Sequence, residues 1–262
     1  MVRVNWSRYS PDIENIYLSY NQITEMNWEG VPSGLKTFLL GYNQITEMNL
    51  EGAPSGLEVI GLWNNQITEM NWEGVPSGLQ NIILQSNQIT EMNWEGAPSG
   101  LEKIHLDNNP ITEMNWEGVP SGLKTIGLDC NHITEIIWEG VPSGLEYIHL
   151  GGNQITEMNW EGVPSSLQKI DLRKNQITEI NWEGVPEEAQ IYPEVLNDLK
   201  NKHITSMKCI KSKAKPLRPI IDQIKHLSLT NPENNKYSVV RKYCGVEFRE
   251  LMEEALGFDL VQ

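Results

Sequence analysis

The chain has 262 residues and a formal net charge of −15 at pH 7. The charge is uneven, because residues 1–186 carry 8 Lys and Arg against 24 Asp and Glu, whereas residues 187–262 carry 12 against 11. Binding along a phosphate backbone needs clustered positive charge, which this acidic body lacks. No apolar run approaches the ~20 residues of a membrane span. We therefore expect neither a nucleic-acid partner nor a membrane partner.

The amino terminus and the cysteines indicate an intracellular setting. Residues 1–6 include a basic residue without an apolar segment behind it, so we expect no secretory signal. Cys130, Cys209 and Cys244 are odd in number and lack the spacing of a metal site, and we expect them to be reduced thiols. No cofactor or metal is predicted.

A phrase of 22 residues recurs eight times, and it is marked by an asparagine at a fixed position. The asparagines are Asn21, Asn43, Asn65, Asn87, Asn109, Asn131, Asn153 and Asn175. A fixed period of roughly 20 to 30 residues is the signature of a solenoid, in which one unit is copied and stacked. We predict an N-terminal half-repeat cap over residues 1–12, eight repeats over 13–186, and a small α-helical C-terminal cap or domain over 187–262.

Within each repeat the apolar residues predict a strand. In the fifth repeat, Ile104 and Leu106 are two apart, so both side chains point to one face, and Leu101, Ile111 and Met114 complete the inward set. Stacked copies place equivalent isoleucines side by side at about 4.8 Å per strand. The eight strands are therefore predicted to form one parallel sheet.

The repeated asparagine and tryptophan both have structural interpretations. The asparagine lies where the strand ends, and its amide offers a donor and an acceptor to backbone groups that the turn leaves unpaired. We favour this role over a ligand site. Tryptophan occupies one position in seven repeats, and Leu50 takes it in the second. The tryptophans could form a binding stripe, but we expect them to fill the core with the indole N–H bonded to a backbone acceptor. Leu50 then predicts a local packing deficit.

The segment that returns to the next strand, such as residues 115–122, is short and contains Gly and Pro. We therefore expect turns or a single 3₁₀ turn there, not an α-helix. Two glutamates per repeat, Glu113 and Glu117 in the fifth, recur in all eight copies. We interpret these two acidic columns as solvated rims. Calcium binding is the alternative, but no repeat has the alternating Asp and Gly pattern of a calcium loop.

The pattern L-x-x-I-x-L-x-x-N-x-I resembles the leucine-rich repeat family over about residues 13–186. The 22-residue length and the P-S-G-L lead-in are similar to short repeats of bacterial effector proteins. The N-Q-I-T-E phrase is similar to repeat proteins of giant DNA viruses of amoebae, which would place the protein in the host cytoplasm. The resemblance implies an α/β-type solenoid, curved and right-handed, with the parallel sheet on its concave side. It also implies protein binding as the usual activity.

Residues 191–262 lose the period and predict helices instead. A proline at the first position favours the first of them. The basic link over residues 208–218 could be a nucleic-acid or localisation patch, but it lacks interleaved aromatics and we interpret it as a solvated loop. The predicted helices cover residues 193–202, 219–227, 233–243 and 246–256.

Bacterial effectors with similar repeats can carry a helical ubiquitin-ligase domain with a catalytic cysteine. Cys209 lies beside the basic link, which could favour a reactive thiolate. Neither Cys209 nor Cys244 begins a Cys-x-Asp motif, so the enzyme hypothesis rests on analogy. The sequence contains no nucleophile–base pair or phosphate loop, and we predict no enzyme. The alternative is the substrate-recognition part of a ubiquitin-ligase-like effector that acts through a C-terminal cysteine. A structural or packaging role is the third hypothesis.

The repeats differ mainly on the outward face of the strands, while the return phrase is nearly constant. We therefore predict that the concave face binds an unidentified protein or peptide, and that the chain is a monomer or weak oligomer. Random tolerated change is the alternative. The predicted binding residues run from an aromatic end to a basic end: Tyr17, Tyr20, Leu39, Tyr42, Trp63, Ile83, Gln85, His105, Asp107, Asp129, His149, Asp171, Arg173 and Lys174.

Three features of this face carry separate expectations. Its aromatic residues are the usual anchors of an interface. The glycines at 127, 151 and 152 are expected to form a shallow floor for a partner side chain. His105 and His149 could be considered for zinc, but they lie two strands, about 10 Å, apart, which is far for one ion. We expect ordinary polar contacts there.

Overall fold

The computed structural model describes residues 6, 10–47 and 49–193, and residues 196, 200, 201, 204, 205, 207 and 208. The chain divides into two compact units, Met1–Asn197 and Asp198–Gln262. The described residues from 196 onward have helical backbone, and three of them fall in the helix predicted for 193–202. The other predicted helices lie outside the described residues. In the described part, no helix has the length and apolarity needed to cross a bilayer.

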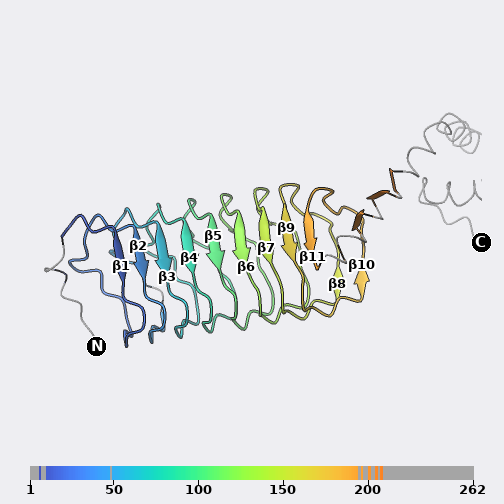
Figure 1. Cartoon of the computed structure of the whole chain (residues 1–262). Helices are drawn as coiled ribbons and strands as arrows, with labels where there is room; N and C mark the ends of the chain where they lie inside the picture. The colour runs from blue at the N-terminus through green and yellow to red at the C-terminus, as the bar shows by residue number, and fades with distance from the viewer. Residues whose placement is uncertain are drawn as a thin grey trace, which may run out of the picture. The chain divides into compact units, whose positions relative to one another are not determined.

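Nine three-residue strands form one parallel sheet, and strands that follow one another lie side by side (Figure 1). Equivalent residues pair at every step, as Ile60 with Ile82 and Ile82 with Ile104. The predicted parallel stacking is therefore confirmed. The strands are β1 Asn15–Tyr17, β2 Thr37–Leu39, β3 Val59–Gly61, β4 Asn81–Ile83, β5 Lys103–His105, β6 Thr125–Gly127, β7 Tyr147–His149, β9 Lys169–Asp171 and β11 Gln190–Tyr192.

The predicted count of eight sheet strands is wrong, because β11 adds a ninth. It pairs in parallel with β9 and places Ile191 beside Ile170, which is 21 residues earlier and not 22. The lead-in to β11 is one residue shorter than in the other repeats, and Ala189 takes the position of the buried leucine. The sheet therefore continues past the point at which the sequence period ends.

The chain returns from one strand to the next through turns, and residues 10–47 and 49–193 contain no helix. This agrees with the prediction from Gly and Pro. Two repeats add a feature that the sequence did not indicate. Strands β8 Glu157–Met158 and β10 Glu179–Ile180 pair in parallel and form a small separate sheet (Figure 1). We call the surface formed by these return segments the return side.

The core lies between the nine-stranded sheet and the return side, and tryptophans fill much of it. Trp72 and Trp94 stack with ring centroids 6.1 Å apart, and their indole N–H groups donate to backbone carbonyls of the following repeat at 2.6 and 2.8 Å. The structural interpretation of the column is confirmed at these positions. At Trp116 and Trp160 the buried indole N–H has no partner within the described structure, so the expected hydrogen bond is wrong there. Leu50 interrupts the column and is fully buried. The same repeat has Phe38 where the others have isoleucine, and its ring lies 5.3 Å from that of Trp28.

The asparagine ladder is confirmed. Asn109 accepts the backbone N–H of Ile89 at 3.0 Å and donates to the carbonyls of Leu106 and Leu84 at 2.9 and 3.0 Å. The same three bonds recur from Asn43 to Asn153, and these six asparagines are buried. Each amide thus links its own turn to the preceding repeat, which satisfies backbone groups that would otherwise be unpaired in the core.

Candidate partner-binding face

The outward side chains of the nine-stranded sheet and of the turn that follows each strand form one surface, which we call the sheet face. In the fifth repeat its members are Lys103, His105, Asp107 and Asn108. Ile104 lies between the first two but is fully buried, because successive strand residues point to opposite sides. This is the surface to which the sequence assigns partner binding.

The sheet face changes in character between repeats 4 and 5. In repeats 1–4 none of the outward positions carries a charged residue, and we call this part the aromatic half. Repeats 5–8 form the charged half. Its Asp, Lys and Arg residues at outward positions are Lys103, Asp107, Asp129, Lys169, Asp171, Arg173 and Lys174.

Two exposed tyrosines stack on each other in the aromatic half. The rings of Tyr20 and Tyr42 have centroids 4.3 Å apart and planes only 10° apart. Tyr20 is 75% exposed, Tyr42 43% and the neighbouring Tyr17 65%. Desolvation, together with the charge and hydrogen bond of Tyr42, raises the pKa of Tyr20 above its ordinary value. The exposed, stacked pair therefore offers a large ring surface to a partner.

Trp63 lies across two glycines of the sheet. A Cβ atom on Gly41 would stand 2.1 Å from Cε2 of the indole, and one on Gly61 would stand 2.3 Å from Cζ3. Leu39 also approaches Gly61, with Cδ2 2.8 Å from the same Cβ position. Only glycine leaves room for this arrangement. Trp63 and Leu39 are consequently half-buried, and they are less exposed than the sequence predicted for interface anchors.

The turn after each strand includes one residue with a left-handed backbone. Asparagine and glycine adopt this conformation readily, whereas a bulky side chain makes it less favourable. The aromatic half nevertheless has Tyr20 and Tyr42 there, with φ of 61° and 55°, where the next repeat has Asn64 at 53°. The presence of tyrosine at a strained position favours a functional role for its ring.

An open hollow of about 480 Å³ borders Tyr42 at the ends of the strands of the aromatic half. Its walls include amide and hydroxyl groups from Gln44, Gln66, Asn64 and Ser86. The hollow therefore provides hydrogen-bonding groups beside Tyr42. A partner segment that covers the rings can place a polar group there.

The acidic side chains of the charged half bond to the solenoid itself. Asp107 accepts the backbone N–H of Asp129 at 3.0 Å and the side-chain amide of Gln85 at 2.8 Å. Asp129 accepts the N–H of Gly151 at 2.7 Å. Each of these two carboxylates thus joins its own repeat to the next one, a role that the sequence did not indicate.

The predicted glycine floor is wrong, because side chains of the protein cover it. A Cβ atom on Gly127 would lie 2.7 Å from Oδ2 of Asp107, and one on Gly151 would lie 3.1 Å from Oδ1 of Asp129. The corresponding atom on Gly152 would lie 3.1 Å from Sγ of Cys130. These glycines make room for the preceding repeat and leave no open floor for a partner.

Burial and neighbouring charges shift three titrating groups of the charged half. Desolvation lowers the pKa of His105, partly offset by Asp107. Desolvation raises the pKa of Asp129. Burial also acts to raise the pKa of Asp171, but hydrogen bonds and charge from Arg173, with a contribution from His149, outweigh it and the net pKa is lowered. Among the described residues, no group of three or more His, Cys, Asp and Glu side chains is arranged to hold a metal ion.

The set of residues predicted from sequence omits the first residue of each strand. These positions also belong to the sheet face, and strand alternation alone could have found them. In β4 this residue is Asn81, whose side-chain oxygen is buried and has no hydrogen-bond partner within the described structure. In β7 it is Tyr147, whose hydroxyl donates to Gln168 at 2.8 Å. The aromatic half therefore contains one buried acceptor that the described structure leaves unsatisfied.

No protein-family model and no curated protein matches the chain. Solved structures do. The chain is similar to YopM from Yersinia enterocolitica WA-314 (20% identity, TM-score 0.53, 69% of this chain and 41% of that one). It is also similar to a Shigella effector leucine-rich-repeat domain (19%, 0.51, 72% and 75%) and to a TLR13–ssRNA13 complex (20%, 0.56, 70% and 30%). The chain thus spans less than half of YopM and of TLR13. Its fold is that of the leucine-rich-repeat proteins.

Proposed function

We propose that this protein is a binding module without catalytic activity, which holds a protein or peptide segment on the aromatic half of its sheet face. The observation that carries the proposal is the exposed Tyr20–Tyr42 stack beside Trp63, which Gly41 and Gly61 hold in place. Aromatic side chains with few accessible rotamers supply large contact areas at a small entropic cost, and they dominate interface energetics.

The charged half has a secondary role in this proposal. The half-buried carboxylates of Asp107 and Asp129 already bond to the backbone, so they contribute little new contact. The exposed cations Lys103 and Lys174 lie nearby on the same face. Charges at the edge of an interface mainly change the association rate and exclude unsuitable partners. We therefore assign discrimination between partners to the charged half and most of the binding affinity to the aromatic half.

The test uses peptides selected from a random display library against the full chain. The affinity of each selected peptide is measured by fluorescence anisotropy for the wild type and for Tyr42→Ala with Trp63→Ala. We expect the double variant to lose a few kcal/mol of binding free energy, as for anchors of an interface. Lys103→Ala, in the charged half, is the matched control and should bind nearly as well as the wild type.

Salt dependence supplies an independent check, because screening weakens charge pairs but not ring contacts. Binding by the uncharged aromatic half should change little between low and high salt. Equal affinity of the wild type and the double variant, or loss of binding in high salt, would place the binding site elsewhere.

The ubiquitin-ligase alternative depends on Cys209 and Cys244, which lie outside the described residues. A ubiquitin-transfer assay on the wild type and on Cys209→Ser with Cys244→Ser distinguishes it, because transfer that needs either cysteine would contradict a purely binding role. Single-stranded RNA is tested in the same anisotropy assay, since one structural neighbour is an RNA complex. We expect no RNA binding by this acidic chain. An intracellular, monomeric or weakly oligomeric protein remains our expectation.

A further inference from the structure

Repeat 6 departs from the other seven repeats at one exposed position of the return side. It has Ile137 where the others have asparagine, and Ile137 is 58% exposed. The asparagine accepts the backbone N–H of the glutamate two residues later, as Asn115 does from Glu117 at 2.9 Å and Asn159 does from Glu161 at 3.1 Å. Isoleucine has no acceptor, so repeat 6 lacks this turn hydrogen bond. A local rule broken in one copy is expected at a functional site.

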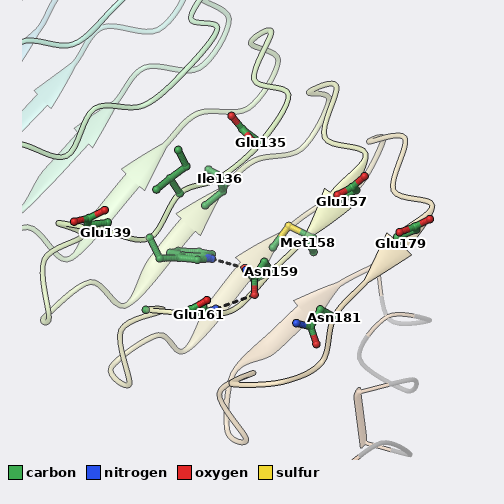
Figure 2. Close-up of a pocket in the computed structure, with 12 residues that line it drawn as sticks. Glu135, Ile136, Glu139, Glu157, Met158, Asn159, Glu161, Glu179 and Asn181 are labelled. Carbon is green, nitrogen blue, oxygen red and sulfur yellow. Dashed lines mark hydrogen bonds between the residues drawn. The ribbon is translucent and has the colours of Figure 1, made fainter. Parts of the chain in front are cut away.

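Ile137 lines an open groove of about 790 Å³ between the return segments of repeats 6, 7 and 8 (Figure 2). Ile136, Trp138 and Met158 also line it but are almost fully buried, so Ile137 provides the exposed apolar side chain. None of the described residues that line the groove is Lys or Arg. The acidic side chains among them are Glu135, Glu139, Glu157, Glu161 and Glu179.

One border of the groove is the edge of a strand. The hydrogen bonds of β8 go to repeat 8, where Asn181 donates to the carbonyl of Met158 at 2.9 Å. Within the described residues, no backbone hydrogen bond joins β8 to residues 135–137 on its other side. Figure 2 shows Glu157 on β8 and Glu135 on the facing segment of repeat 6. An unpaired strand edge is a template for an extended segment of another chain.

We propose that this groove is a second interaction surface, which binds an extended basic segment of a partner protein. An aliphatic side chain of that segment contacts Ile137, and its Lys or Arg side chains lie among the glutamates. Both acidic columns run along the whole solenoid, but among the described residues only repeat 6 adds an exposed large apolar side chain to them. Within the described residues, this groove combines an exposed apolar side chain, negative charge and a strand edge without backbone hydrogen bonds to repeat 6, and this combination selects it from the other return segments.

The probe is a fluorescein-labelled peptide of alternating lysine and leucine, because alternate residues of an extended segment face opposite sides. Anisotropy measures its binding to the full chain. Ile137→Asn restores the residue that the other repeats have, and with it the turn hydrogen bond, so the variant should fold. We expect it to bind the peptide about tenfold or more weakly, the change that corresponds to losing one apolar anchor.

Matched variants separate the groove from the general negative charge of the protein. Met92→Ile makes the same kind of exchange at the equivalent buried position of repeat 4, away from the groove, and should leave binding unchanged. Glu135→Gln with Glu157→Gln removes two charges at the groove, and it should weaken binding several times more than the same change at Glu69 and Glu91 of the same column. Equal effects of the two pairs, or wild-type affinity of Ile137→Asn, would overturn the proposal. Peptide selection on the sheet face, tested separately, should be unaffected.

Discussion

The two halves of the sheet face share one backbone frame and use their outward side chains in different ways. In the charged half, Asp107 and Asp129 bond to the backbone of the next repeat. In the aromatic half, Tyr20, Tyr42 and Trp63 contact one another or the glycines below and keep ring surface exposed. Variation between repeats therefore does not by itself mark a binding residue. Some of the variable positions stabilise the solenoid, and others are available to a partner.

The largest expected effect comes from the asparagine ladder, which the two halves share. Asn87→Ala and Asn131→Ala each remove four side-chain hydrogen bonds, including the three of the ladder, and leave buried backbone groups unpaired. Each should lower the free energy of unfolding by about 3–5 kcal/mol, measured by urea denaturation. Asn21→Ala, at the exposed end of the ladder, should cost clearly less. A marked difference between the stability losses at Asn87 and Asn131 would show that the two halves differ in their backbone hydrogen bonding and not only in their outward side chains.

Glycine substitutions probe what covers each half. Gly41→Ala forces the rigid indole of Trp63 to move and should destabilise the protein by about 1–3 kcal/mol. Gly127→Ala meets the end of the Asp107 side chain, which can rotate away, so we expect a smaller loss of about 1 kcal/mol. Gly144→Ala has only ordinary contacts and serves as the control. Thermal unfolding measures the relative stability of the three variants. A larger loss for Gly127→Ala than for Gly41→Ala would contradict the claim that the indole is the more rigid obstacle.

Asp107 tests whether the carboxylates of the charged half are structural. Asp107→Ala leaves the N–H of Asp129 without its acceptor and should lower the free energy of unfolding by about 1–2 kcal/mol. Asp107→Asn retains an acceptor oxygen and should stay close to the wild type. Neither variant should weaken a peptide that binds the aromatic half. A strong loss of peptide affinity in both variants would show that the aromatic half and the charged half belong to one binding site.

Tyr42→Asn separates binding from stability in the aromatic half. Asparagine tolerates the left-handed backbone at this position better than tyrosine, so the free energy of unfolding should rise by up to ~1 kcal/mol. Peptide affinity should fall, because the stack with Tyr20 is lost. The reverse change at the next repeat, Asn64→Tyr, should reduce stability. A lower free energy of unfolding for Tyr42→Asn would show instead that Tyr42 stabilises the fold by packing.

The smallest expected effect is a pH dependence from His105. Its folded-state pKa lies below the ordinary value of 6.5, so as the pH falls below 6.5 the unfolded chain binds a proton before the folded protein does. Stability should therefore decrease through this range, and His105→Gln should remove that part of the decrease. Urea denaturation at pH 7.5 and pH 5.5 measures it, with His132→Gln at an exposed position as the control. If His105→Gln and His132→Gln lost stability equally between pH 7.5 and pH 5.5, the pH dependence would not come from His105.

Local features of the repeat could be predicted with no structure. The alternation around Ile104 gave the strand, and the position of Asn109 gave the ladder, because both depend on short-range backbone geometry that each copy repeats. The resemblance to leucine-rich repeats, carried by the same residues, agrees with the solved structures that match. The strand β11 could not be predicted in this way, because the missing residue in its lead-in shifts it out of the 22-residue register.

The sequence by itself determined a parallel stack of short strands, its tryptophan-filled core and the split of the sheet face into uncharged and charged halves. Only the tertiary structure decided which outward side chains are available. Contacts between repeats place Trp63 over Gly41 and turn Asp107 onto Asp129, and these contacts join residues 22 positions apart. The direction of an outward side chain depends on the space that the neighbouring repeats leave for it. The sequence of a single repeat therefore does not predict that direction.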